Sequence, residues 1–197
     1  MAYVITIEHL VAIAGKRTAL MPQITDWLNK TCPEYEIDTV QEIAHFLAQA
    51  CHETDCFRTL REYASGSAYE GRLDLGNSRK GDGTRFKGRG IFQTTGRANY
   101  LQLGIKKGRR DLFVNAPDLL AEPEYAVWSA CEYWAVRNLN DAANHADSDI
   151  LKKKYRGKVI DVSPVEFISI TVNGGYNGME ARKVFYLRAK NILSQAV

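Results

Sequence analysis

The stretch that decides the fold is TVQEIAHFLAQACHETDCFRTLRE, residues 39–62. It opens with a capping box, in which Thr39 and Glu42 each bond to the backbone of the other at the start of a helix. Apolar residues then recur at helical spacing, which predicts a buried helix directly after Thr39. Glu53 falls at the edge of this apolar stripe, and Glu62 follows downstream among arginines.

Start signals predict three further helices. Pro123 suits the first turn of one of them. Ser163 and Glu166 form a second capping box, and the helix they open should end at the loop sequence NGGYNG. A last amphipathic helix is expected from about Met179, with apolar positions that include Val184, Leu187 and Ile192.

Residues 64–90 differ from the helical segments because they are rich in glycine and polar turn residues. This composition predicts a loop with, at most, short strands. No Pro-, Ser- or Gly-rich linker, internal repeat or low-complexity tail divides the chain. We therefore expect one mainly α-helical domain over residues 1–197, in which this irregular insert forms the wall of a cleft.

The composition supports a folded domain and excludes several classes of protein. Of 197 residues, 45% are hydrophobic and 25% are charged, so a sizeable core is expected. The formal net charge of +3 is too small to indicate a nucleic-acid partner. The densest basic runs, KKGRR (106–110) and LKKKYRGK (151–158), are interpreted as solvated surface loops.

The amino-terminal segment lacks the features of a signal peptide. It has no basic region, and Glu8 and His9 interrupt its apolar run. No stretch approaches ~20 uninterrupted apolar residues, so we expect no membrane insertion. Synthesis as a cytoplasmic chain is the interpretation that follows.

The cysteines and histidines do not form a metal-binding pattern. None of the four cysteines belongs to a CxxC, and no histidine pair has metal-ligand spacing. We expect no metal and no cofactor. Cys51 and Cys131 are expected to pack as free, apolar thiols, although a disulfide remains an alternative in an oxidising compartment.

Two carboxylates of different character are what the hydrolysis of a glycosidic bond needs. One must keep its proton near neutral pH, and partial burial beside apolar side chains at Glu53 suits that role. The other must stay ionised, and the basic, more exposed setting of Glu62 near Arg58 and Arg61 suits it. The alternative is that both glutamates are surface residues in ordinary ion pairs.

Three segments then stand out in order along the chain: AHFLAQACHETDCF (44–57), RFKGRGIFQTTGRANY (85–100) and NGGYNG (173–178). They resemble the F-x-A-Q-x-x-H-E-[ST], G-R-G-x-x-Q-[IL]-[ST] and N-G-G motifs of glycoside hydrolase family 19. This family comprises the plant-type chitinases and many bacteriophage endolysins. Thr94 departs from the pattern, which has an aliphatic residue there. The resemblance covers nearly the whole chain and implies a lysozyme-like α+β fold.

Carried over residue by residue, the resemblance implies a catalytic set. Glu53 is the general acid and Glu62 the general base of a reaction that inverts the anomeric configuration. Thr95 falls where the family holds the attacking water, and Asn173 falls where an asparagine contacts the sugar or the water. Gln93 lies in the same segment and is expected to contact the sugar.

Several neighbouring residues have two interpretations. Glu70, in the short insert, is the reserve candidate for the base. Tyr63 and Tyr100 either stack on sugar rings or belong to the core. His52 either contacts the substrate or is a structural histidine. Thr95 either holds the water, caps the next helix, or does both.

The sequence leaves the choice between two substrates open. Chitin contains only N-acetylglucosamine, whereas peptidoglycan alternates it with N-acetylmuramic acid that carries a peptide. The short insert leaves an open cleft, and the absent signal peptide is similar to phage endolysins that are released through a holin. We therefore expect a monomeric, peptidoglycan-cleaving lysozyme with no separate wall-binding domain. It would be made in the host cytoplasm and act in the periplasm and cell wall. A chitinase and a non-catalytic cell-wall binder are the alternatives.

Overall fold

The predicted helix after Thr39 is the central helix of the computed structural model, which describes residues 3–195. It is α3 (Val40–Glu53). The capping box is confirmed, because the Glu42 N–H donates to the Thr39 hydroxyl at 3.2 Å and the Thr39 N–H donates to the Glu42 carboxylate at 3.0 Å. All residues from Glu42 to Cys51 are buried, so α3 is covered on every side. Its most extensive contact is with α10 (Met179–Ser194).

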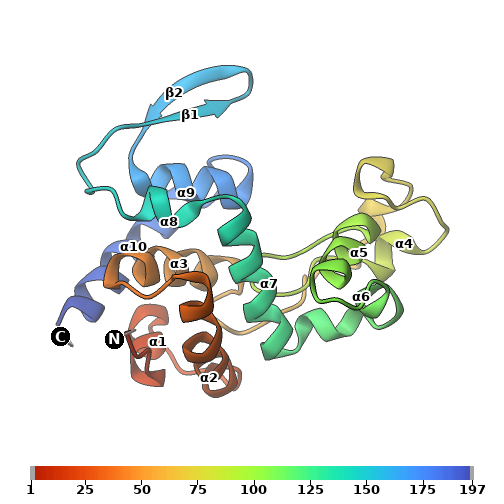
Figure 1. Cartoon of the computed structure of the whole chain (residues 1–197), viewed down its shortest axis with the longest axis horizontal. Helices are drawn as coiled ribbons and strands as arrows, with labels where there is room; N and C mark the ends of the chain where they lie inside the picture. The colour runs from red at the N-terminus through yellow and green to blue at the C-terminus, as the bar shows by residue number, and fades with distance from the viewer. Residues whose placement is uncertain (1–2, 196–197) are drawn as a thin grey trace.

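The larger hydrophobic core surrounds α3. It is closed by α1 (Ile7–Ala14), α2 (Met21–Thr31), the short 3-10 helix η1 (Cys32–Tyr35), α7 (Pro123–Val136) and α10. Phe46 of α3 meets Trp134 of α7 edge to face at 5.3 Å between ring centroids. Aromatic pairs of this geometry contribute ~0.5–1.5 kcal/mol beyond their area burial. Helix α7 continues from this core into the second part of the molecule (Figure 1).

The second part has its own smaller core. Its elements are α4 (Asp82–Arg85), α5 (Arg97–Lys106), α6 (Leu112–Asn115) and the 3-10 helix η4 (Pro117–Ala121). Phe86, Phe113 and Trp128 meet in this core, and Trp128 comes from α7. One helix thus supplies side chains to both cores, which fixes the two parts relative to each other.

The glycine-rich insert is irregular, as predicted. It contains two 3-10 turns, η2 (Ser67–Tyr69) and η3 (Leu73–Leu75), and the single-turn helix α4. Buried Asn77 holds it together by donating to the Tyr69 carbonyl at 2.9 Å and accepting from the Arg97 N–H at 2.9 Å. Asp82 adds a buried ion pair with Arg97. Side-chain hydrogen bonds and an ion pair, and not a β-sheet, therefore hold the insert together.

The strands lie elsewhere than expected. β1 (Leu151–Tyr155) and β2 (Lys158–Val162) form an antiparallel hairpin, in register from Leu151 opposite Val162 to Tyr155 opposite Lys158. The turn residues Arg156 and Gly157 have φ of 48° and 79°, as in a type I′ turn. The interpretation of LKKKYRGK as a surface loop was wrong in its structure, because alternation of lysine with Leu151 and Tyr155 suits a half-buried strand.

Of the remaining helices, α9 and α10 were predicted in extent, whereas α8 was not predicted and the apolar face of α10 was wrong. α8 (Leu139–Ala143) precedes the hairpin, and α9 (Pro164–Asn173) follows it with the predicted capping box. In α10, however, Val184 and Leu187 are exposed, which corrects the predicted apolar face. The buried stripe is Met179, Arg182, Tyr186, Ala189 and Leu193. Among residues 3–195, no helix has the length and apolarity needed to cross a membrane.

Candidate active site

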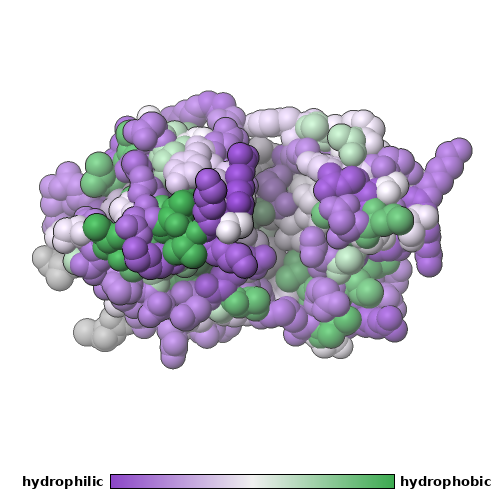
Figure 2. All heavy atoms as spheres, turned by 90° about the horizontal axis from the view of Figure 1, so that it is seen from above, coloured by the Kyte–Doolittle hydropathy of each residue, from purple (hydrophilic) through white to green (hydrophobic). Residues whose placement is uncertain are grey.

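A groove with a volume of about 770 Å³ lies between the two parts of the molecule. Helix α7 forms its floor through Tyr133 and Arg137. The segment leading into α5 forms one wall with Gln93 and Thr95, and the end of α9 forms the other with Asn173. Figure 2 shows this hollow from above, between a larger and a smaller part.

Glu53 lies at the end of α3, where it forms an ion pair with Arg182 of α10. The guanidinium also donates to Gln49 Oε1 at 2.5 Å, and the Gln49 amide donates to the Ser169 hydroxyl at 3.0 Å. Arg182 is 1% exposed, while the side chain of Glu53 is 19% exposed. The apolar setting expected for Glu53 is therefore corrected to a buried polar network that reaches the surface at this carboxylate.

Only one oxygen of Glu53 is used by this network. Arg182 pairs with Oε1, and within the described chain Oε2 has no hydrogen-bond partner. The ion pair fixes the plane of the carboxylate while one oxygen remains available. Burial raises the pKa of the Tyr133 hydroxyl, Arg137 opposes that rise, and the Glu53 carboxylate adds to it. Glu53 thus acts electrostatically on a residue of the groove floor.

Arg182 was missed at the sequence level, although a signal was present. Met179, Arg182, Tyr186 and Ala189 follow one another at helical spacing. A single arginine in an apolar stripe must find a buried partner, because burial of an unpaired charge is costly. The buried glutamine and half-buried glutamate of α3 meet that need.

Glu62 lies in the loop that follows α3. Its carboxylate accepts from the Tyr69 hydroxyl at 2.9 Å and from the Gly88 N–H at 3.0 Å, one bond to each oxygen. Burial raises the pKa of Tyr69, and the hydrogen bond to Glu62 adds to that rise. A Cβ added at Gly88 would lie 2.8 Å from Gln93 Oε1 and 3.2 Å from Glu62 Oε2. Glu62 is thus oriented directly behind Gln93.

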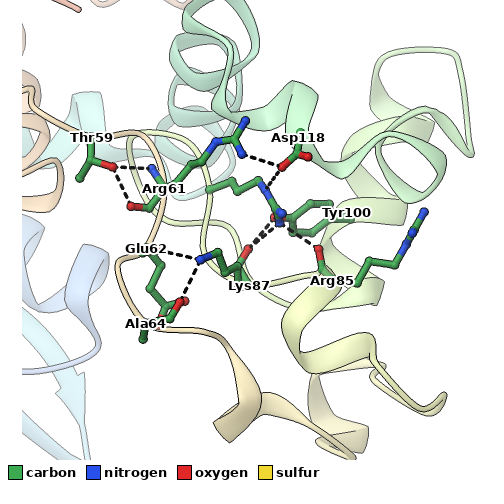
Figure 3. Close-up of polar contacts among 9 residues, drawn as sticks. Thr59, Arg61, Glu62, Ala64, Arg85, Lys87, Tyr100 and Asp118 are labelled. Carbon is green, nitrogen blue, oxygen red and sulfur yellow. Dashed lines mark hydrogen bonds and ion pairs between the residues drawn. The ribbon is translucent and has the colours of Figure 1, made fainter.

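Cations beneath this loop hold it in place (Figure 3). The Lys87 ammonium donates to the carbonyls of Glu62 at 3.0 Å and Ala64 at 2.9 Å. Arg61 and Arg89 both pair with Asp118 at 3.0 Å. The backbone that carries Glu62 is therefore fixed from two sides.

Tyr100 belongs to this support and not to the sugar-binding surface. It is fully buried, its hydroxyl donates to the Lys87 carbonyl at 2.6 Å, and it accepts from Arg89 at 2.9 Å. Burial raises its pKa to about 12. The alternative that Tyr100 stacks on a sugar ring is therefore wrong.

Thr95 lines the groove but does not cap α5. Its hydroxyl donates to the Gln93 carbonyl at 2.9 Å, and the N-cap of α5 is Gly96, with φ of 94°. A Cβ at Gly96 would lie 2.6 Å from the Leu75 carbonyl oxygen, so only glycine fits this close approach. The capping alternative for Thr95 is therefore corrected, and the lone pairs of its hydroxyl remain available on the groove wall.

Glu70, Tyr63 and His52 have positions that limit their roles. The Glu70 carboxylate accepts from the N–H groups of Gly81 at 2.6 Å and Gly83 at 2.8 Å, so it closes a turn of the insert. Tyr63 is 76% exposed. A Cβ at Gly178 would lie 2.3 Å from the His52 ring, which shows that His52 packs on the backbone where α10 begins. None of the three lines the groove.

The groove thus brings together Gln93, Thr95 and Asn173, whereas Glu53 and Glu62 are not among its lining residues and lie close to Tyr133 and Gln93, which are. Arg137 is a groove residue that the sequence did not indicate; its guanidinium lies 3.4 Å from the centroid of the Tyr133 ring. Over residues 3–195, no cluster of histidine, cysteine and acidic side chains is arranged to hold a metal ion.

Comparison with known proteins gives relatives by sequence and by fold. No family model matches the chain. A glycosyl hydrolase family 19 domain-containing protein of Haemophilus influenzae is 27% identical over 125 residues, which is 64% of this chain and 51% of that protein. The matched segment therefore spans about half the length of this relative.

Two solved structures share the fold along almost the whole chain. Chitinase C from Streptomyces griseus matches with a TM-score of 0.62 at 18% identity, covering 98% of this chain and 94% of the other. A bacterial family 19 chitinase matches with a TM-score of 0.61 at 20% identity, covering 97% and 95%. The predicted mainly helical, lysozyme-like α+β fold is confirmed. The sequence relative and the shared fold both support the predicted resemblance to glycoside hydrolase family 19.

Proposed function

We propose that the protein is an inverting glycoside hydrolase that cuts the glycan strands of bacterial peptidoglycan. One observation supports this proposal: two carboxylates, each oriented by its own partners, lie close to residues that line a single groove. Glu53 is held by Arg182 from one side, and Glu62 is held by Tyr69 and Gly88 from the other. A pair of carboxylates flanking the scissile bond is the chemical requirement for glycoside hydrolysis.

In the proposed reaction, the protonated form of Glu53 donates its proton from Oε2 to the glycosidic oxygen while Oε1 stays bonded to Arg182, and the bond from the glycosidic oxygen to the anomeric carbon breaks. Glu62 accepts a proton from a water whose oxygen attacks the same carbon from the opposite face. Inversion requires ~6.5–9.5 Å between the carboxyls, so that this water fits. The Thr95 hydroxyl donates to the Gln93 carbonyl, which leaves its oxygen to accept a hydrogen from the water.

The choice of substrate rests on the charge in the groove. Chitin is the alternative, since the similar solved structures are chitinases. Arg137 lies in the groove with no carboxylate within ion-pairing distance among residues 3–195. A free cation suits peptidoglycan, whose peptides and lactyl groups add carboxyl chemistry that neutral chitin lacks.

We also propose that the protein acts as a monomer on the cell wall after leaving the cytoplasm through a holin, and that one domain both binds and cuts. Fractionation of infected or expressing cells with and without a holin tests the release. Protein that reaches the periplasm equally in both cases would contradict it.

Digestion of purified peptidoglycan and of chitin oligomers, each followed by mass spectrometry and NMR of fresh products, tests the activity. We expect soluble muropeptides with inverted new reducing ends, and no product with Glu53→Gln. The sugar at the reducing end identifies the bond. Cleavage of chitin alone would assign the chitinase function, and binding without any product would assign the wall-binding function.

A further inference from the structure

The β1–β2 hairpin concentrates positive charge on one side of the groove. Its cationic side chains are Lys152, Lys153, Lys154, Arg156 and Lys158. Asp161 pairs with Lys152. Lys154, Arg156 and Lys158 are exposed and have no ion-pair partner in the part of the chain that the structure describes. An excess of free charge therefore remains at the turn end of the hairpin.

The hairpin that carries these charges is packed firmly against the helical body. The inward side chains Leu151, Tyr155 and Ile160 pack against Ile170 and Met179 of the helical body. The Lys153 ammonium donates to the Thr171 hydroxyl at 2.5 Å and lies 4.1 Å from the centroid of the Phe167 ring. The tight type I′ turn adds rigidity. A preorganised set of cations loses less conformational entropy on binding than a flexible loop would.

The β1–β2 hairpin lies next to the groove. Thr171, the anchor of Lys153, is itself a lining residue of the α9 wall. Burial lowers the pKa of Lys153, and the charge of Arg137 in the groove adds to that effect, so the two cations influence each other directly. Tyr155 meets Tyr176, from the loop after α9, edge to face at 5.6 Å. In Figure 1 the hairpin turn points toward the middle of the molecule, and Figure 2 shows hydrophilic side chains along the hollow there.

We infer that Arg137 and the hairpin residues Arg156 and Lys158 form one anion-binding surface for the stem-peptide carboxylates of peptidoglycan; Lys154 points to the other face of the hairpin. This inference rests on the proposed function and names the part of the substrate that the groove itself does not hold. A glycan strand in the groove would carry its peptides out over the α9 wall, where the free cations lie. The surface would select peptide-bearing strands over neutral ones.

The test neutralises the hairpin and compares it with a matched control. The hairpin variant combines Arg156→Gln and Lys158→Gln. The control combines Arg109→Gln and Arg110→Gln, which removes the same charge from exposed residues outside the groove lining. Both sets are made in the Glu53→Gln background, so that binding is measured without digestion. Sedimentation is done with intact peptidoglycan, with peptidoglycan stripped of its peptides by an amidase, and with chitin.

We expect the hairpin variant to bind intact peptidoglycan about two- to thirtyfold more weakly, since each exposed ion pair contributes modestly. Its affinity for stripped glycan and chitin should equal that of the control, and its binding should depend less on salt. Equal affinity of both variants for intact peptidoglycan would overturn the inference. Capture of the parent by phosphatidylglycerol vesicles, but not by peptidoglycan, would also overturn it and assign a membrane partner.

Failure of the inference and failure of the proposed function give different results. If the active parent cuts peptidoglycan and neutralising the hairpin changes nothing, the function stands and the surface does not. If the parent cuts no glycan but only the hairpin variant loses binding to intact peptidoglycan, the surface stands and the hydrolase function does not.

Discussion

Arg182 of α10 and Glu53 of α3 form an ion pair that joins two helices 129 residues apart in sequence. The arginine is buried and the glutamate reaches the surface beside the groove. The pair therefore links the most extensive helix contact of the fold to the orientation of a single carboxylate. We therefore expect the stability of the fold and the proposed catalysis to depend on the same guanidinium.

Replacement of Arg182 by Met should lower both stability and activity. It leaves Gln49 Oε1 without its donor and Glu53 without its cation, and breaking a buried pair in this way costs ~3–5 kcal/mol. Urea unfolding followed by circular dichroism measures the stability change. Arg182→Lys should recover only part of it, because an ammonium cannot reproduce the planar fork of the guanidinium.

The exposed Arg109 offers a matched control. Arg109→Met should change the unfolding free energy by less than ~0.5 kcal/mol, as is usual for surface substitutions. If Arg182→Met proved as stable as this control, the network around Arg182 would be structurally unimportant and the account of Glu53 given above would be wrong.

Glu53→Gln should still fold, at lower stability because the buried Arg182 loses its anionic partner, and should lose ~10²-fold or more in cell-wall clearing, because an amide accepts from Arg182 but cannot donate a proton as an acid. Glu62→Gln should also lose activity, since the water would lack its base. Clearing of outer-membrane-permeabilised bacteria, with circular dichroism as the fold control, measures both. Parental clearing by folded Glu53→Gln would exclude Glu53 as the general acid.

The sequence predicted the parts of the fold that depend on local signals. The capping boxes at Thr39 and Ser163 and the proline at the start of α7 define helix starts within a few residues. The buried face of α10 differs from the predicted one, because it contains Arg182, a charged residue that a pattern of apolar residues does not mark. The hairpin was not predicted, because the many lysines of residues 151–158 suggested a surface loop although Leu151 and Tyr155 alternate with them.

The residues that line the candidate site could be predicted from the sequence, but the tertiary contacts that hold the site in place could not. Gln93, Thr95 and Asn173 line the groove, in segments that the motifs marked. The burial of Tyr100 depends on Arg89 and on the Lys87 carbonyl, which are tertiary contacts without a local signature. Such pairings become visible only when the chain is folded.

Thr95→Val should abolish most activity at nearly unchanged side-chain volume, and Thr95→Ser should retain most of it. The valine removes the hydroxyl that bonds to the Gln93 carbonyl and would receive the water. Stability should change little, because Gly96 and not Thr95 is the N-cap of α5. Initial rates on soluble muropeptides for the three forms measure this; equal rates for valine and threonine would remove Thr95 from the reaction.

A final prediction concerns His45, which is fully buried in α3 and stacks on Tyr186 with ring centroids 3.9 Å apart. Both ring nitrogens are buried without a hydrogen-bond partner among the described residues. Burial lowers the pKa of His45 from 6.5 to about 3. The unfolded chain therefore binds a proton that the folded chain excludes, so stability is complete above pH 6.5 and is lost as the pH falls toward 3.

Between pH 7 and pH 5 this loss should be about 2 kcal/mol, because each pH step below the unfolded pKa costs ~1.4 kcal/mol. Nearby Asp147 does not interfere, since the effect of burial on its pKa is outweighed by hydrogen bonds from Lys190 and Tyr186, and the lowered pKa lies below this window. His45→Leu should remove most of the difference between urea midpoints at the two pH values, whatever its absolute stability. His145→Gln, at a partly exposed histidine paired with Asp149, should keep it. An equally large pH dependence in His45→Leu would mean that another group carries the acid sensitivity.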